Sequence, residues 1–454
     1  MLEKLLKFEE GKTLEFKENA TSLDPIIRTV IAFANTAGGI LIIGVKNKTK
    51  EIVGINNVLD NEERITNKIY DSIEPAIFPD ITITSWRKKE LIIIQVPHSI
   101  GPFFLKSKKM FQSTYIRLGS TNRIADKNTI DELLRLKENK TYDELPSIYS
   151  KLSDLDSDSL NDFFLRINKK NTKDKCLSLK LFQKKDSKIV PSNGGLLLFC
   201  KNREKLFPNS IIRCARFLGT EKVEIIDQYD FDMDLTKVID EILKFIKRNT
   251  YLRSEIKEIQ RKDIREYPIV VLREAITNAI LHSDYTVRGS NIQIAIFDNR
   301  IEITNPGALP YGLTLTDALN GMSLLRNRVI GKIFKKLKII EQWGSGFGRI
   351  FNHCAKLGYK KPKIEELGHF FQITIYNEKS TIKILTFKKS WMKIVFEHIK
   401  KEGFISVKQA SKIWKVTERT ARLRLIEMIK EEMIIEVGTS VYDPRKKYML
   451  SKHF

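Results

Sequence analysis

The stretch Tyr-Pro-Ile-Val-Val-Leu-Arg-Glu-Ala-Ile-Thr-Asn-Ala-Ile-Leu-His-Ser-Asp-Tyr, residues 267–285, has the periodicity of one amphipathic helix. Pro268 stands where a helix can begin without losing a hydrogen bond. At helical spacing, an apolar stripe forms that is expected to face a core; its residues are Leu272, Ile276, Ala279 and Ile280. A different face carries Glu274, Asn278 and His282, which recur every four residues. The stretch therefore predicts a buried helix with one polar face.

The polar face suits the binding of a phosphorylated ligand. The amide oxygen of Asn278 can bind a hard cation such as Mg²⁺, which carries phosphates with it. Glu274, one turn earlier, can orient or deprotonate a water near those phosphates. His282 can lie beside the nucleotide or can simply be a hydrogen-bonded histidine at the end of the helix. Because polar residues four apart usually form a solvated face, this pattern needs support from elsewhere in the chain.

Two later stretches give that support. Residues 301–307 read as a strand that runs into the tight turn Asn305-Pro306-Gly307. Residues 341–350 form a glycine-rich loop at the start of an expected helix. Glycines at alternate positions let backbone amides approach a phosphate. The glycines at alternate positions in this loop are Gly344, Gly346 and Gly348.

In this order and spacing, the three stretches resemble the GHKL-type ATP-binding fold of gyrase, a large heat-shock chaperone, histidine kinases and MutL. They are most similar to its divergent branch in prokaryotic transcriptional regulators, often labelled as RecG-like DNA helicase C-terminal. The resemblance implies that Glu274 orients the attacking water and that Asn278 binds Mg²⁺. It places the three glycines in the phosphate lid, with His282 and Gly307 beside the nucleotide. Asn305 stands where the wider superfamily has an Asp that reads the adenine amine, and an Asn oxygen can accept the same hydrogen bond.

From this resemblance we expect ATP and Mg²⁺ as ligands, with weak or absent ATP hydrolysis. The resemblance extends over about residues 150–378. Arg326, which precedes an apolar helical segment, is a candidate phosphate contact, and the alternative is an ordinary surface arginine. No Gly-x-x-x-x-Gly-Lys-Ser/Thr loop occurs in the sequence, which argues against a translocating helicase motor.

The length and the net charge of the chain indicate the number of domains and the kind of partner. The chain has 454 residues, too many for one ordinary core, so roughly three domains are expected. Seventy-nine Lys and Arg against 56 Asp and Glu leave a net charge of +23. Such an excess favours a polyanionic partner, DNA first and RNA second, over a lysine-rich genome background.

Cysteine usage and hydropathy indicate a cytoplasmic protein without membrane contact. The four cysteines show no Cys-x-x-Cys spacing, which argues against a zinc ribbon and a disulfide framework. The first ten residues are mixed in charge, unlike a signal peptide. The apolar runs are far shorter than a bilayer requires.

Residues 1–135 predict one α+β domain. Residues 14–17 alternate as a half-buried strand, and residues 26–34 carry a helical apolar stripe that Gly38-Gly39 ends. Residues 40–45 form a continuous apolar run, as expected of a strand covered on both faces.

This region resembles the Schlafen/Alba-like domain in the segments around residues 14–17, 32–45 and 115–120. In that family the domain binds nucleic acid, and animal Schlafens cleave RNA with two Glu and one Asp around a divalent metal. Glu10 and Glu15 match the two Glu positions, whereas Asn47 stands in place of the Asp and weakens a metal site. The alternative for Glu15 is a solvent-facing ion pair with Lys17.

The tail, residues 381–454, predicts a third unit and is similar to a winged helix-turn-helix. From about residue 385 it carries 16 Lys and Arg against 8 Asp and Glu. Thr417 is expected to cap the recognition helix. Candidate contacts to base edges and phosphates are Arg419, Thr420, Arg422 and Arg424 on the helix and Arg445, Lys446 and Lys447 on the wing. Winged helices also mediate protein contacts, so both uses stay open.

The sequence therefore predicts an α/β and α+β multidomain protein with a divergent GHKL-like α/β sandwich in residues 136–380. Two functions remain in competition. One is a nucleotide-responsive DNA-binding transcriptional regulator. A homodimer is compatible with this function, because helix-turn-helix proteins often read paired half-sites. The other is a Schlafen-type metal-dependent nuclease in RNA processing or antiviral defence.

Overall fold

The computed structural model describes residues 2–250, 252–257, 260–340, 346–377, 389–431, 433–437 and 447–450. The chain divides into two compact units. The first comprises residues 1–353 and 362–375, and the second comprises residues 354–361 and 376–454. Within the described ranges, no helix combines the length and the apolarity needed to cross a membrane.

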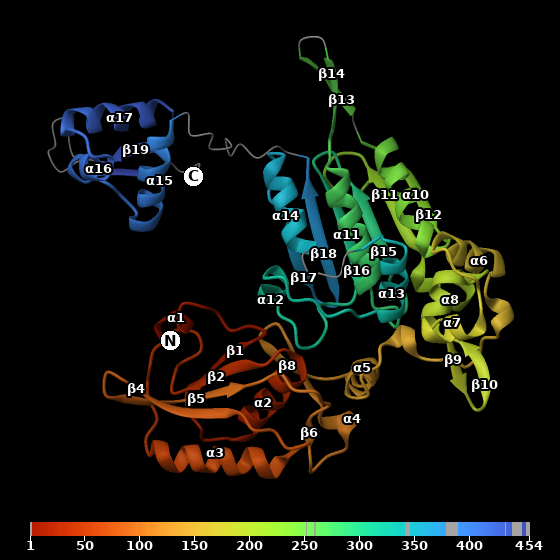
Figure 1. Cartoon of the computed structure of the whole chain (residues 1–454). Coiled ribbons are helices and arrows are strands. Elements are labelled where there is room, and N and C mark those ends of the chain that lie inside the picture. Colours follow the sequence, from red (N-terminus) through yellow and green to blue (C-terminus); the bar gives the residue numbers. More distant parts are fainter. Residues whose placement is uncertain are drawn as a thin grey trace. The chain divides into compact units, whose positions relative to one another are not determined.

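The N-terminal part of the first unit is built on a four-stranded sheet (Figure 1). In spatial order its strands are β1 (Leu14–Lys17), β2 (Gly39–Ile43), β5 (Lys89–Val96) and β4 (Asp80–Trp86). β1 and β2 are parallel, and the other two neighbouring pairs are antiparallel. The strands and the helix that the sequence predicts around residues 14–45 are confirmed.

Both faces of β2 are covered, as the continuous apolar run of residues 40–45 predicted. On one face Leu41 and Ile43 belong to a core with α2 (Asp24–Thr36) and α3 (Val58–Ser72). On the other face Ile42 packs with Phe16 and with α1 (Leu2–Leu5). Elements that follow are β3 (Ile73–Glu74), β6 (Phe104–Leu105), α4 (Met110–Ser113), the hairpin β7 (Tyr115–Leu118) and β8 (Thr121–Ile124), and α5 (Lys127–Lys137).

A connecting region of short elements leads to the second sheet. It consists of the 3-10 turns η1 (Tyr142–Glu144), η2 (Leu152–Asp154) and η3 (Pro208–Ser210), the helices α6 (Ser157–Arg166), α7 (Lys173–Ser178), α8 (Asn193–Phe199) and α9 (Arg203–Leu206), and the hairpin β9 (Phe182–Lys185) and β10 (Lys188–Pro191). Asp143 in η1 joins this region to the following domain, because its carboxylate accepts hydrogen bonds from the backbone N–H groups of residues 328–330.

The second sheet has six strands and carries helices packed against it (Figure 1). Its spatial order is β12 (Ile225–Phe231), β11 (Ile212–Phe217), β15 (Ile292–Ile296), β16 (Arg300–Pro306), β18 (Phe370–Tyr376) and β17 (Lys363–Leu367). β15 and β16 form an antiparallel hairpin, in which β16 is the strand that the sequence predicts at residues 301–307, and β11 pairs with β15 in parallel. The helices of this region are α10 (Leu235–Arg248), α11 (Ile269–His282), α12 (Leu315–Leu319), α13 (Arg328–Lys336) and α14 (Gly346–Lys356), and β13 (Leu252–Lys257) pairs with β14 (Gln260–Arg265) as a separate hairpin.

From residue 389 on, the described part of the second unit contains three helices and a two-stranded hairpin around its own core. Its elements are α15 (Ser390–Glu402), α16 (Val407–Trp414), α17 (Glu418–Lys430), β19 (Ile434–Val437) and β20 (Lys447–Leu450). Thr417 caps α17 by accepting a hydrogen bond from the N–H of Thr420, as predicted. Ile405 forms an isolated antiparallel bridge with Tyr448.

Candidate functional site

Helix α11 supplies one wall of the candidate site. It begins after Pro268, which occupies the position before the first helical residue. Its apolar stripe is buried in the core, whereas Glu274, Asn278 and His282 are half-buried on the side that lines a cavity. The polar residues spaced four apart thus face an internal hollow instead of bulk solvent.

Strand β16 supplies the opposite wall through its last residues. Asn305 is only 3% exposed, and its Nδ2 donates to the carbonyl of Pro306 at 3.1 Å. Its Oδ1 takes no part in that bond and can accept a hydrogen bond from a ligand. Gly307 has a φ of +94°, and a methyl group there would lie 2.3 Å from Nη1 of Arg326. Both the turn and the available space require glycine at this position.

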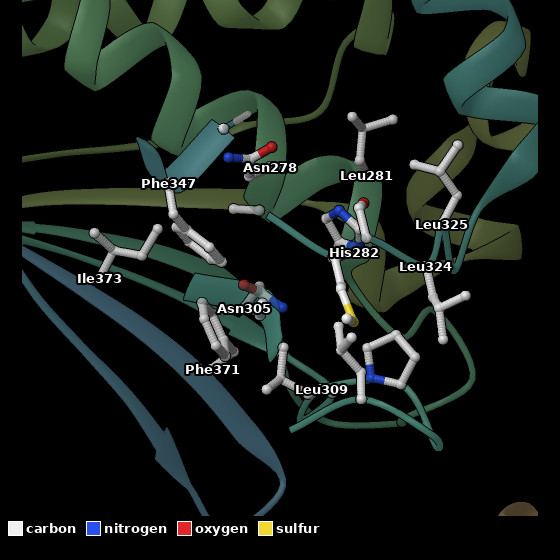
Figure 2. A pocket seen from close by; sticks show the side chains of 18 of the residues that line it. Asn278, Leu281, His282, Asn305, Leu309, Leu324, Leu325, Phe347, Phe371 and Ile373 are labelled. Carbon is white, nitrogen blue, oxygen red and sulfur yellow. The ribbon is translucent and has the colours of Figure 1, made fainter. Parts of the chain in front are cut away.

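The cavity between these walls has a volume of about 460 Å³. Figure 2 shows Asn278, His282 and Asn305 directed into it, with Phe347 beside Phe371 at one side. The two aromatic rings lie 5.9 Å apart between centroids. Apolar side chains of Leu309, Leu324 and Leu325 complete much of the lining. A mostly apolar hollow with a few convergent polar groups is the usual form of a small-molecule site.

The described part of the glycine-rich segment begins at Gly346 and lies against the polar face of α11. A methyl group at Gly346 would lie 2.9 Å from Oε1 of Glu274 and 3.1 Å from Nδ2 of Asn278. Nη2 of Arg349 lies 3.3 Å from Oε2 of Glu274 and forms an ion pair with it. Gly348 does not line the cavity, and Gly344 falls outside the described residues. The structure thus brings Glu274, Asn278, His282, Asn305, Gly307 and Gly346 to one cavity.

Burial lowers the pKa of His282 to about 4, and the nearby Arg326 guanidinium acts in the same direction. The imidazole is therefore neutral near pH 7 and contributes no charge to the cavity.

Arg326 is not the surface arginine that the sequence offered as the alternative. Its side chain is 10% exposed. Nη1 donates to the carbonyls of His282 and Ala308 at 3.0 and 2.9 Å. It ties the end of α11 to the loop after Gly307, which no sequence signal indicated.

Phe347 and Phe371 were also missed as lining residues. Phe347 lies inside the glycine-rich segment, and its position there was the only available signal. Phe371 belongs to β18, whose place next to β16 is set by the sheet order.

The N-terminal candidates are arranged differently. Glu10 accepts a hydrogen bond from the N–H of Phe16 at 2.8 Å and another from Nδ2 of Asn47 at 2.6 Å. Glu15 is 4% exposed and is paired with both Arg117 and Lys17. Over the described ranges, no group of three or more His, Cys, Asp and Glu side chains is placed to hold a metal ion. The carboxylate of Glu15 is neutralised by two cations, an arrangement that opposes metal binding.

The ion pair with Lys17 that the sequence offered as the alternative for Glu15 is present, but it is not solvent-facing. The second cation paired with Glu15, Arg117, is 2% exposed. Its Nε also donates to the carbonyl of Gly11 at 3.0 Å.

In the second unit, the DNA-contact candidates separate into two groups. Arg419 and Arg422 are exposed on α17, and Thr420 shares a hydrogen bond with the hydroxyl of Thr417. The Arg424 guanidinium instead lies over the rings of two tryptophans of this unit, 5.0 Å from the Trp391 centroid and 5.6 Å from the Trp414 centroid.

On the hairpin, the Lys447 ammonium lies 3.8 Å from the centroid of the Phe404 ring. Arg445 and Lys446 fall outside the described residues.

Comparisons with known proteins agree with the arrangement of the first unit. Residues 10–126 match the family described as "Schlafen, AlbA_2". Residues 289–375 match the family described as "Putative ATP-dependent DNA helicase recG C-terminal", and this match begins after α11 has ended. No curated protein matches the chain.

Two solved structures align with the chain at low TM-scores. One is the DIP2311 protein from Corynebacterium diphtheriae, with 18% identity, 97% of this chain and 92% of that chain covered, and a TM-score of 0.46. The other is the N-terminal domain of a RecG-related putative ATP-dependent DNA helicase from Nitrosomonas europaea, with 24% identity, 27% of this chain and 90% of that chain covered, and a TM-score of 0.22. The family matches, not these structures, support the assignment: the chain carries a Schlafen AlbA_2 domain followed by an ATPase-like domain of the RecG C-terminal type.

Proposed function

We propose that this protein is a nucleotide-responsive DNA-binding protein that acts as a transcriptional regulator, with ATP held in the cavity between α11 and β16. The observation that carries the proposal is the convergence of Asn278, Asn305 and Gly346 on one cavity of about 460 Å³. Three segments far apart in the chain meet there, each with the residue type that a Mg²⁺–nucleotide requires.

Each wall has a separate role in this proposal. The adenine lies among the apolar and aromatic side chains, with its amine directed at Oδ1 of Asn305. The phosphates lie beside Gly346, where backbone N–H groups at the start of α14 can reach them. Asn278 supplies one oxygen ligand to Mg²⁺, and the phosphates and waters supply the others, since Mg²⁺ seldom takes all its ligands from protein.

The ion pair of Glu274 with Arg349 supports slow hydrolysis. A carboxylate held by a guanidinium is less free to turn toward a water molecule and orient it. We therefore propose ATP binding with weak or absent ATPase activity.

Contacts inside the first unit supply a route by which the nucleotide can act on the N-terminal domain. The loop after Gly307 lines the cavity, and Gly312 in that loop donates to the carbonyl of Thr36 at 2.6 Å. Glu366 accepts from the N–H of Leu309 and from Lys12 of the N-terminal domain. A ligand that moves this loop will strain or relax contacts with the domain that carries the nucleic-acid-binding resemblance.

We propose that the second unit is a winged helix that contacts DNA through α17. Arg419 and Arg422 present exposed guanidinium groups on this helix, which suits phosphates and base edges of a major groove. The N-terminal domain can add contacts to DNA or RNA. No observation favours the nuclease function, because the carboxylate of Glu15 is already paired.

Isothermal titration with ATP and Mg²⁺ tests the nucleotide site. The wild type is expected to bind, and Asn278→Ala is expected to bind at least about tenfold more weakly, because an oxygen ligand of the cation is lost. Equal affinities in the two proteins would reject the site. Binding of duplex DNA with and without ATP then tests whether the nucleotide alters DNA affinity.

A further inference from the structure

A second cavity lies beside the nucleotide cavity and has a strongly basic lining. Its volume is about 680 Å³, and it shares Pro310 and the segment 323–325 with the first cavity. Seven of its lining residues are Lys or Arg, whereas two are Asp or Glu. The proposed ATP site uses none of these nine charged side chains.

Helix α13 gives the cavity a continuous cationic wall. Arg328, Lys332 and Lys336 follow one another at intervals of four, so they lie on one face of this helix. Burial and the positive charges of Lys180 and Lys336 lower the pKa of Lys332. The carboxylate of Glu144 offsets part of this repulsion, and a bound anion would relieve the rest.

A buried donor without a partner marks the inner end of the cavity. The Arg326 side chain is nine-tenths buried, and its Nε has no hydrogen-bond partner within the described part of the chain. Burial also raises the pKa of Glu132, the carboxylate 3.4 Å from Arg326, which weakens it as a counter-charge. An unpaired N–H of a buried guanidinium is costly, so a small shift of the Arg326 side chain that let this N–H meet a ligand oxygen would be favourable.

The remaining lining includes the aromatic rings of Tyr142 and Tyr311. The Arg135 guanidinium lies 5.8 Å from the centroid of the Tyr142 ring. Rings and guanidinium planes of this kind stack on nucleobases.

We propose that this cavity binds a nucleoside monophosphate, either free or as the 5′-phosphorylated end of a nucleic-acid strand. Its phosphate lies against α13 and Arg326, and its base lies against Tyr142 and Tyr311. A phosphate monoester carries close to two negative charges at neutral pH, which matches the excess of cationic over anionic side chains in the lining better than an internal phosphodiester does.

Calorimetric titration of the full-length protein with AMP, in the absence of Mg²⁺, tests this site. Lys332→Gln/Lys336→Gln removes two exposed charges from the wall while keeping good helix-forming residues. We expect this variant to bind AMP at least about tenfold more weakly than the wild type. The matched control is Lys244→Gln/Lys247→Gln, which removes two exposed lysines from α10 outside the cavity and should leave AMP affinity unchanged. Equal AMP affinity in the first variant and the wild type, or an equal loss in the control, would overturn the proposal.

Two further comparisons separate this site from the ATP site and identify the source of the phosphate. Asn278→Ala should lose Mg²⁺–ATP binding and keep AMP binding; if it loses both, AMP binds in the first cavity and the second site is rejected. The second comparison uses a 5′-phosphorylated tetranucleotide and its 5′-hydroxyl counterpart. The site is assigned to strand ends if the phosphorylated form binds more tightly than both AMP and the 5′-hydroxyl form, and if this tighter binding is lost in Lys332→Gln/Lys336→Gln. AMP affinity equal to that of the phosphorylated strand would assign it to the free nucleotide.

Discussion

Oε2 of Glu274 lies 3.3 Å from Nη2 of Arg349, so the residue expected to orient water at the γ-phosphate is held in an ion pair by the helix that follows the glycine-rich loop. Gly346, at the start of that helix, stands next to both Glu274 and Asn278. In the proposed complex, the phosphates of the nucleotide therefore lie next to an arginine that is already paired with the carboxylate of Glu274. The contributions of Glu274 and Asn278 to nucleotide binding can therefore be separated by experiment.

The first prediction concerns Glu274→Gln, which should bind Mg²⁺–ATP severalfold more tightly than the wild type. The substitution removes a negative charge next to the phosphates and frees Arg349 to contact them. Asn278→Ala should change affinity in the opposite direction. Isothermal titration measures both, and weaker binding by Glu274→Gln would contradict the placement of the triphosphate. Any slow hydrolysis by the wild type should disappear in Glu274→Gln.

The second prediction concerns the stability of the N-terminal domain. Glu15→Gln leaves Arg117 as a nearly unpaired buried cation, because both side chains of that ion pair are almost fully inaccessible. We expect a loss of about 3–5 kcal/mol in the free energy of unfolding, measured by urea denaturation. Glu51→Gln breaks an exposed ion pair with Lys46 in the same domain and should leave the transition where it is. A nuclease role for Glu15 would gain support only if Glu15→Gln kept wild-type stability and lost Mn²⁺-dependent RNA cleavage.

The third prediction distinguishes two arginines of α17. Arg424→Ala should destabilise the second unit by about 1 kcal/mol, because its guanidinium packs over Trp391 and Trp414. Arg422→Ala should leave the thermal transition unchanged, since this side chain is exposed. It should instead weaken duplex DNA binding and reduce the dependence of log affinity on log salt by about one unit. The proposed DNA contact fails if Arg422→Ala binds DNA like the wild type at every salt concentration.

The fourth prediction concerns the acid sensitivity of the first unit. The pKa of His282 is about 4 in the folded protein against a usual value of 6.5, so its neutral form is favoured by folding. Its contribution to stability is complete above about pH 6.5 and is lost as the pH falls from there toward 4, by up to about 3 kcal/mol. His282→Gln should therefore flatten the fall in unfolding free energy across this range. An identical pH profile in the variant would show that His282 does not titrate in this way.

Asp143 acts in the opposite direction in an overlapping range. Burial raises its pKa to about 6 from a usual 3.8, although Thr141 and backbone N–H groups donate to it. Its contribution is complete below about pH 3.8 and is lost as the pH rises through 6. Because the contributions of Asp143 and His282 partly cancel in the wild type, only the difference between wild type and variant at each pH isolates one of them. The same comparison with Asp143→Asn should remove the loss of stability between about pH 4 and 6.

Much of the local structure was predictable from residue spacing. The strand at residues 14–17, the hairpin of β15 and β16 and the helix α11 all follow from apolar periods of two or 3.6 residues. The spacing of four between Glu274, Asn278 and His282 placed them on one face before any packing was known. Their convergence with Asn305 depended on a family resemblance, since nothing local links a helix to a turn that follows a later hairpin.

The sequence alone determined which segments are helices and strands, because backbone hydrogen bonding and side-chain periodicity act between residues close together in the chain. Only the tertiary structure decided the partners of the buried arginines. Glu15 meets Arg117, 102 residues later, and Arg326 meets the carbonyl of His282, 44 residues earlier. The same holds for the stacking of Arg424 on Trp391. The long side chain of an arginine can contact many neighbouring groups. Its partner is the acceptor that packing leaves buried beside it, away from water. The spacing of residues in the sequence does not encode that property.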